Sequence, residues 1–279
     1  MSTNTRKPRT MSSIHLPGLV NPHDLSTDRQ FSMNLARGMQ VLRAFTLADP
    51  LLGNREISDR TGLPKPTVSR LTYTLTLLGY LSRVDNLQKY RLGSGVLSLG
   101  YPLLANMRVR QIARPIMEKV ARETGCNVNL GMRDRTSVVY VDTCRVDRGN
   151  VYQPDIGSTR PLLSSAIGRA LILASPPAER KAILNRLKIE DPQRFQLDKP
   201  LWEAEQTEFF ERGYCYSRGD WRKDIHALAV PIRQLQREEP MALNCTLSAF
   251  RLGKNTLEKL AANQLLDAIQ QIEAACGLH

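Results

Sequence analysis

The stretch from Arg55 to Leu81, REISDRTGLPKPTVSRLTYTLTLLGYL, constrains the fold more than any other part of the chain. It contains two helical patterns separated by Gly62, a residue that readily takes the left-handed conformation at which helices end. The second pattern begins near Pro66, which is tolerated because the first turn of a helix needs no backbone donor. Its apolar residues recur at spacings of three and four and are Val68, Leu71, Leu75 and Leu78. Two short helices joined by a tight turn are therefore predicted.

The opposite face of the second helix is short, polar and hydrogen-bonding. It holds Pro66, Arg70 and Tyr73, with Thr67, Ser69 and Thr74 on its flanks. A helix that contacts base edges in the major groove of DNA needs such a face. We therefore interpret this helix as a DNA-recognition helix.

The segment after Gly79 alternates apolar and polar residues around an Asp85-Asn86 turn, which predicts a β-hairpin with outward-pointing basic side chains. Helix, turn, helix and basic hairpin in this order describe a winged helix-turn-helix. The alternative is an ordinary helical pair inside an enzyme, with solvated basic residues. The predicted DNA-contacting residues are Arg37, Lys65, Thr67, Ser69, Arg70, Tyr73, Arg83, Lys89 and Arg91.

Positive charge is concentrated at the N-terminal end. The net charge is +12; residues 1–93 hold 13 Lys and Arg against 6 Asp and Glu, and residues 94–279 hold 26 against 21. Such a field favours a polyanionic partner, and double-stranded DNA is the partner we expect. A membrane-surface function would need a basic amphipathic helix, and the sequence shows none.

The cysteines are Cys126, Cys144, Cys215, Cys245 and Cys276, and none has a CxxC or other ligand spacing. This dispersed, odd set without a secretory signal predicts reduced thiols in the cytoplasm, with no metal site and no cofactor. No apolar run reaches the roughly 18–20 residues that a membrane-spanning helix requires. Residues 1–30 lack an apolar segment, and we expect a disordered tail there.

Residues 31–93 are expected to form the DNA-binding domain. The buried stripe of its first helix is predicted to be Leu35, Met39, Leu42 and Phe45 or Val41, and Asn54 is expected to cap the next helix. Residues 94–110 predict a linker helix, kinked near Tyr101-Pro102. Its apolar face packs either on its own copy in a dimer or within the core of the same chain.

Residues 111–279 mix helix-period and strand-period segments, which predicts an α+β domain with an antiparallel sheet. The predicted strands are NVNLGM, SVVYVDTC, GYCYS, HALAVPI and PMALNCTL. The predicted helices cover residues 111–124, a part of 161–175 that contains Ile167, Leu171 and Ile172, then 177–188, about 200–212 and 256–275. We expect Ser164 to cap the second of these, and Asn255 with Glu258 to form a capping box at the last.

With these motifs in this order, the chain resembles the IclR family of bacterial transcriptional regulators. The resemblance runs from Asn34 to the C-terminus and is carried by LPKPTVSRLTYTLTLLGYL, YRLGSGVLSLG, ARPIMEKVARETGCNVNLGM, RPLLSSAIGRAL and RGYCYS followed by IHALAVPIR. It implies a winged helix-turn-helix, a linker helix and a C-terminal effector-binding domain of GAF-like architecture. It also implies dimers or tetramers on an operator. The RGYCYSRGDW and PLLSS blocks are similar to members that govern aromatic-acid catabolism.

The resemblance further implies a pocket for a small-molecule effector. The residues carried over to it are Ser164, Ser165, Ala166, Gly168, Ala227, Asn244 and Thr246. Asn244 and Thr246 are two apart and share one strand face, while a helix N-terminus beside the serines favours an anion such as a carboxylate. The alternative is that the serines only cap the helix. Arg222 and Lys223 depart from the family's acidic pattern and either favour an anionic effector or are solvated surface.

The prediction is thus a ligand-responsive regulator of a catabolic operon whose effector is a small carboxylic acid, aromatic acids included. One alternative is a DNA-binding regulator without an effector. Another is an enzyme that uses His226 as a base with Cys215 or Cys245 as the nucleophile. No nucleophile elbow or HExxH motif accompanies these residues, so we predict no enzymatic activity and assign no catalytic residue.

Overall fold

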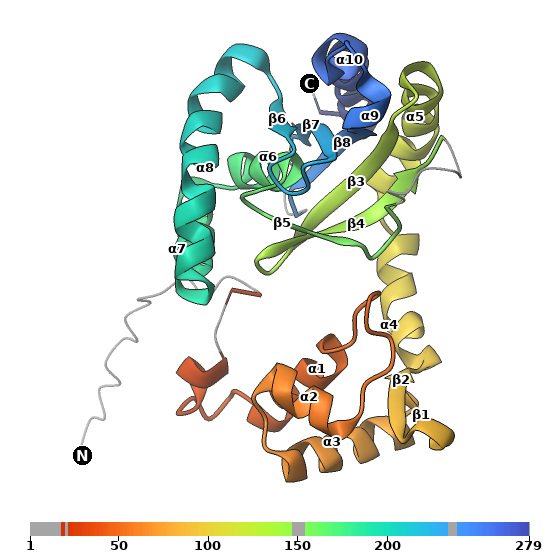
Figure 1. Ribbon diagram of the computed structural model, residues 1–279, viewed down its shortest axis with the longest axis vertical. Helices are drawn as coiled ribbons and strands as arrows, with labels where there is room; N and C mark the ends of the chain where they lie inside the picture. Colours follow the sequence, from red (N-terminus) through yellow and green to blue (C-terminus); the bar gives the residue numbers. More distant parts are fainter. Residues whose placement is uncertain (1–17, 20–21, 147–153, 234–238, 279) are drawn as a thin grey trace, which may run out of the picture.

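The computed structural model describes residues 18–19, 22–146, 154–233 and 239–278, which form two parts (Figure 1). The N-terminal part holds three helices and a two-stranded sheet. The C-terminal part holds a six-stranded antiparallel sheet with helices on both faces. Helix α4 runs from one part to the other (Figure 1). The predicted fold class is confirmed.

The N-terminal part is a winged helix-turn-helix. Its elements are α1 (Met33–Arg43), α2 (Asn54–Thr61), α3 (Lys65–Leu77), β1 (Leu81–Val84), the 3-10 turn η2 (Asp85–Leu87) and β2 (Lys89–Leu92). Gly62 lies between α2 and α3 with a φ of 70°, as the turn requires. Leu52 exchanges two backbone hydrogen bonds of 2.8 and 3.0 Å with Tyr90, which ties the wing to the loop before α2.

The apolar stripes of α1 and α3 are only partly buried. Val41 is fully buried, whereas Leu35 and Met39 are 66% and 47% exposed, contrary to the predicted stripe. On α3, Val68 and Leu75 are buried and Leu78, just past the end of the helix, is exposed. The predicted helical periodicity was therefore correct. However, part of the apolar face that it predicts stays exposed to solvent in a single chain.

The linker region is two helices rather than one. The helix predicted over residues 94–110 ends at Ala105 in α4 (Ser94–Ala105), and α5 (Arg108–Thr124) begins after a break at Asn106-Met107. Asn106 closes α4 by donating from Nδ2 to the Pro102 carbonyl at 2.8 Å. No residue of α4 is buried within the chain. The domain boundaries at 30, 93 and 110 stay predictions.

The large sheet has the strand order β5-β4-β3-β8-β7-β6, with every neighbouring pair antiparallel. Its strands are β3 (Asn127–Asp134), β4 (Ser137–Cys144), β5 (Thr159–Pro161), β6 (Cys215–Arg218), β7 (Ile225–Ile232) and β8 (Met241–Ser248). The short edge strand β5 was not predicted. The β3–β4 register shifts between Leu130 and Gly131, so β4 carries an extra residue there.

Helices cover both faces of this sheet (Figure 1). They are α5, α6 (Ala166–Ala174), α7 (Pro177–Glu190), α8 (Pro192–Arg212), α9 (Ala249–Leu252) and α10 (Leu257–Cys276). Helices α5 and α10 pack with Val128 and Leu243 on one face. Helix α6 packs with Tyr140 and Ala229 on the other. Helix α8 begins well before the predicted start near residue 200.

Three predicted helix caps are wrong by one residue. The N-caps are Gly53 rather than Asn54, Ser165 rather than Ser164, and Thr256 rather than Asn255. The Asn54 side chain instead accepts a hydrogen bond from the buried Thr72 hydroxyl at 3.1 Å, which joins α2 to α3. At the other two sites the sequence offers adjacent capping residues, and the local backbone decides between them.

The structure describes part of the N-terminal tail. Pro22–Leu25 forms the 3-10 helix η1, and Leu19 packs against the core on the α6 side of the sheet. The rest of the tail, residues 1–17 and 20–21, lies outside the described residues. Within the described part of the chain, no helix is long and apolar enough to cross a bilayer, and no metal-binding cluster occurs.

Candidate functional site

Helix α3 presents the face that was predicted to contact DNA. Lys65, Ser69, Arg70 and Tyr73 are exposed along it. Thr67 is half-buried and, with Arg70, borders a groove between α1, α3 and α4. Because the apolar residues of α3 hold the helix from beneath, its polar side chains project together from the surface.

The basic residues of the wing are not equivalent. Arg83 is exposed and pairs with Asp85 at 3.1 Å. The Lys89 ammonium turns back to Glu56, with its Nζ 2.7 Å from Oε1. A hydrogen bond from the Gly53 N–H and the contact with Lys89 hold the pKa of Glu56 below its usual value. Lys89 therefore links the wing to α2, and its positive charge is paired with the Glu56 carboxylate.

Two other predicted DNA contacts lie in grooves. Arg37 lines the groove of about 600 Å³ between α1, α3 and α4, and its Nε is buried without a hydrogen-bond partner in the part of the chain described. Arg91 is exposed and lines a cleft of about 880 Å³ between the two parts, together with Arg43 and Arg160. Arg43 on α1 forms an ion pair with Asp134 on β3 and so links the two parts directly.

A second site lies between α6 and the large sheet. It is a cavity of about 20 Å³ lined by Tyr140, Arg160, Ser165, Ala166, Ser217, Trp221, Ile225, Ala227, Asn244 and Thr246. The structure thus brings together five of the seven predicted effector-binding residues. The two others, Ser164 and Gly168, do not line the cavity.

The residues at the start of α6 have distinct tasks. The Ser165 hydroxyl caps the helix by accepting from the Gly168 N–H at 3.2 Å, as the capping alternative supposed, and it also borders the cavity. Gly168 is required by packing, because a Cβ there would lie 2.2 Å from the Leu162 carbonyl oxygen. Ser164 is fully buried, and its hydroxyl has no partner among the described residues.

Sequence reasoning missed half of the cavity lining, namely Tyr140, Arg160, Ser217, Trp221 and Ile225. Strand alternation could have found Ile225, because it lies two residues from Ala227 on β7 and residues two apart on one strand share a face. Arg160 lies in the three-residue strand β5 and Trp221 in the loop after β6. No periodic signal marks either of them.

Hydrogen bonds fix one wall of the cavity. The Asn244 amide accepts from Asn129 Nδ2 at 2.9 Å and donates to the Tyr140 hydroxyl at 3.2 Å. Asn129 in turn accepts from the Thr143 hydroxyl at 2.8 Å. Thr246 donates to the Asn127 carbonyl at 3.4 Å. These partners hold the cavity-lining side chains of the strands in place.

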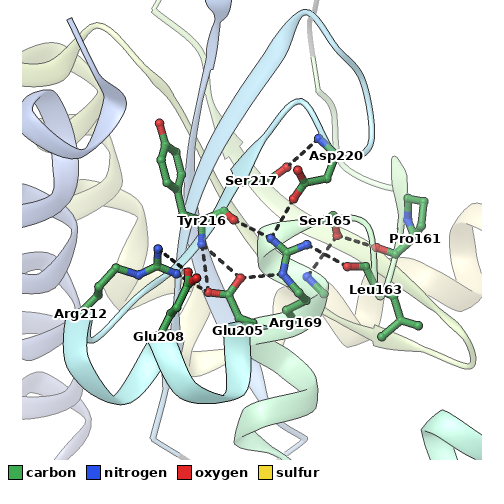
Figure 2. Close-up of polar contacts among 11 residues, drawn as sticks. Pro161, Leu163, Ser165, Arg169, Glu205, Glu208, Arg212, Tyr216, Ser217 and Asp220 are labelled. Carbon is green, nitrogen blue, oxygen red and sulfur yellow. Dashed lines mark hydrogen bonds and ion pairs between the residues drawn. The ribbon is translucent and has the colours of Figure 1, made fainter. Parts of the chain in front are cut away.

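Buried Arg169 organises the opposite side (Figure 2). Its guanidinium is 2.6 Å from Glu205 on α8 and donates to the Leu163 carbonyl at 2.9 Å. It also donates to the Tyr216 carbonyl at 2.6 Å and to the Asp220 carboxylate at 3.0 Å. One side chain thus joins α6, α8, β6 and the loop that carries Trp221, immediately behind the Ser165 cap.

Two of the groups invoked for an enzyme, His226 and Cys215, lie on opposite faces of the sheet. Cys215 packs on the α6 face of the sheet, whereas the neighbouring Tyr216, whose hydroxyl is 3.5 Å from His226 Nδ1, packs on the α5 face. Burial raises the pKa values of the Cys215 and Cys245 thiols well above their usual range, so neither is a ready nucleophile.

A winged helix-turn-helix joined to an α+β domain that encloses a small polar cavity defines a DNA-binding transcriptional regulator. Two family models match the chain: the IclR helix-turn-helix domain over residues 34–85, and the C-terminal domain of the bacterial transcriptional regulator IclR over residues 102–274. The chain belongs to the IclR family of transcriptional regulators.

Individual relatives agree with this assignment. The HTH-type transcriptional regulator TsaQ1/TsaQ2 of Comamonas testosteroni is 30% identical over 243 residues, covering 86% of this chain and 87% of its own. An IclR-family regulator from Brucella abortus is 37% identical with a TM-score of 0.82, covering 92% and 98% of the two chains. An IclR homologue from Microbacterium hydrocarbonoxydans, crystallised with 4-hydroxybenzoate, shares the fold at 23% identity, with a TM-score of 0.67 over 88% and 100%.

Proposed function

We propose that this regulator is ligand-responsive, that it controls a catabolic operon, and that its effector is a small carboxylic acid, aromatic acids included. The cavity beneath α6 carries this proposal, because it combines hydroxyl and amide groups with aromatic walls and one guanidinium. The compound bound in the crystals of the Microbacterium homologue, 4-hydroxybenzoate, belongs to the same chemical class.

A regulator without an effector is the second candidate. At about 20 Å³ the cavity has room for one water molecule, and Asn244 is already satisfied by Asn129 and Tyr140. Any effector must therefore open the site and exchange some of these hydrogen bonds for its own. The two candidates differ in whether a small acid stabilises the protein.

The test is thermal unfolding with a panel of small carboxylic acids that includes 4-hydroxybenzoate. An acid at a hundred times its Kd should stabilise the folded protein by about 2.7 kcal/mol. Asn244→Leu combined with Thr246→Val should abolish this response yet leave DNA binding by the free protein unchanged. Asn185→Leu, at an exposed position of α7, is the control and should respond normally. A response of the double variant at the wild-type acid concentration would place the effector elsewhere.

We also infer that the working unit is at least a dimer, and that a second copy covers the groove between α1, α3 and α4. Leu35, Met39 and Leu99 are exposed in this groove, and α4 buries no residue in its own chain. One winged helix covers one half-site, so paired half-sites require two helix-turn-helix units related by a two-fold axis.

A further inference from the structure

Arg160 and Trp221 lie between the cavity beneath α6 and a groove on the surface. A groove of about 400 Å³ lies between the α7–α8 junction and the β4–β5 edge, and it is lined in part by Ser137, Leu187 and Arg194. Of its lining residues, Arg160 and Trp221 are the two that also line the cavity beneath α6. These two side chains therefore form a wall that borders the groove on one side and the cavity on the other.

Stacking joins the two side chains, and Arg160 Nη1 also donates a hydrogen bond to the Thr159 carbonyl. The guanidinium carbon of Arg160 lies 4.5 Å from the centre of the Trp221 ring and 4.8 Å from the centre of the Tyr140 ring. Only 8% of Arg160 is exposed. Cation–π contacts of this kind are weaker than a buried ion pair, so the stacking contact between the two side chains is one that a ligand's charged group can replace.

The loop beneath Trp221 is anchored separately. The Asp220 carboxylate is bound by Arg169 at 3.0 Å, and the Asp220 N–H donates to the Ser217 hydroxyl at 3.3 Å. Parting the stacked pair therefore requires rotation of side chains and leaves the backbone of the loop in place. Of the three carboxylates in the groove, Glu190 and Asp198 are ion-paired at 2.9 and 2.7 Å, and Asp191 accepts from the Arg194 N–H at 2.9 Å.

The charge in the cavity is positive and comes from a single lining residue. Among the described residues that line it, Arg160 is the one that carries a charge, and the remaining polar groups are hydroxyls and the Asn244 amide. A carboxylate that entered would find its countercharge at this residue alone. The planar fork of an arginine can bind a carboxylate through two parallel hydrogen bonds.

We propose that the Arg160–Trp221 pair is the door of the effector cavity and that Arg160 is the residue that selects and binds anionic effectors. This inference rests on the proposed effector function of the same cavity. On entry the ligand separates the two side chains, and Arg160 exchanges its stacking contact with Trp221 for the ligand's carboxylate. Selection for anions and closure of the site then depend on one side chain.

A cysteine reporter tests the door without any effector. Ala227→Cys places a thiol in the cavity wall, and the five native cysteines are buried, so the parent protein measures the background. The probes are neutral methyl methanethiosulfonate and anionic sulfonatoethyl methanethiosulfonate. Trp221→Ala should raise the rates of both several-fold. Thr246→Cys is a second reporter for use if Ala227→Cys does not fold.

Arg160→Gln in the reporter background should also admit the neutral probe faster. It should lower the ratio of anionic to neutral rates by about tenfold, because the local positive potential is lost. Lys188→Gln, which removes one exposed charge from α7, is the control and should leave the ratio unchanged. Unchanged rates in both Trp221→Ala and Arg160→Gln would overturn the proposal.

Calorimetric titration then separates the door from the effector function. Wild-type protein should bind 4-hydroxybenzoate more tightly than neutral 4-hydroxybenzamide. Arg160→Gln should weaken binding of the acid at least about tenfold, as loss of a charged hydrogen bond predicts, with little effect on the amide. Equal acid binding by wild type and Arg160→Gln would overturn the role of Arg160 and leave the effector function intact. If wild-type protein does not bind 4-hydroxybenzoate but the labelling ratios are as expected, the aromatic acid is not the effector. The proposed role of the Arg160–Trp221 pair would then still stand.

Discussion

Arg70 lies on the exposed face of α3, among the side chains best placed to reach a base edge. Arg70→Ala should cost about 1–3 kcal/mol of affinity for a specific operator, because a bidentate contact to a base is lost, and should change binding to random DNA less. Fluorescence anisotropy with a duplex selected from a random pool measures both. Arg122→Ala, exposed on α5, is the control for loss of one charge. Unchanged operator affinity for Arg70→Ala would remove α3 from base recognition.

His226 makes stability depend on pH. Partial burial, followed by the nearby Arg218, lowers its pKa below 6.5, although Asp220 acts in the opposite direction. The Tyr216 hydroxyl lies 3.5 Å from its Nδ1. The unfolded chain therefore binds the proton more readily, so the stability that neutral His226 contributes is present above about pH 6.5 and is lost as the pH falls through the folded-state value. The Tm of His226→Asn should fall less than that of wild type between about pH 7 and 5, a window set by the ordinary histidine pKa. Identical pH profiles would contradict this.

Helix α6 depends on the ion pair between Arg169 and Glu205, both almost fully buried. Arg169→Met leaves Glu205 buried with Arg212 as its remaining ion-pair partner, so we expect a loss of about 3–5 kcal/mol in the free energy of unfolding of the C-terminal part. Lys199→Met breaks an exposed pair with Glu203 on α8 and should cost only about 0.3–0.5 kcal/mol. Urea denaturation followed by circular dichroism compares them. Similar losses in both variants would show that burial adds nothing to the Arg169 pair.

The recognition elements were predictable because their signals are local. The turn glycine, the period of α3 and the wing hairpin all lie within residues 54–92, so short-range propensities agree with the final packing. Leu35 and Met39 were placed wrongly for the opposite reason. Periodicity marks an apolar face, but it does not say whether the same chain or another copy covers it.

The effector cavity was predictable in part, through the family resemblance. Asn244 and Thr246 were carried over from it, alternation on β8 puts them on one face, and both line the cavity. Arg160 and Trp221 come from a short edge strand and a loop, where no period constrains the side chains. Their meeting depends on tertiary packing around Arg169, which the sequence alone does not reveal.

At the scale of the whole molecule, Arg110 connects the cavity strand to the linker. Its guanidinium is 3.0 Å from the Val141 carbonyl, 3.2 Å from the Asp142 carboxylate and 3.4 Å from the Leu104 carbonyl near the end of α4. Val141 follows Tyr140 of the cavity wall at the irregular register of β4. A ligand that moves this strand therefore acts on the end of the helix that leads to the DNA-binding part. A ligand changes DNA affinity only if it prefers one arrangement of the two parts.

Assembly is the last property that can be tested at this scale. Leu99→Glu puts a charge into the groove between α1, α3 and α4, where burial against a second copy would be costly. We expect sedimentation velocity at micromolar concentration to show a smaller assembly than wild type, and operator affinity to fall because paired half-sites are no longer held at a fixed spacing. Leu197→Glu, at a leucine of α8 that is 72% exposed against 61% for Leu99, is the control and should assemble normally. Wild-type protein that binds its operator as a 31.4 kDa monomer would refute the dimer, and an unchanged Leu99→Glu assembly would move the interface away from this groove.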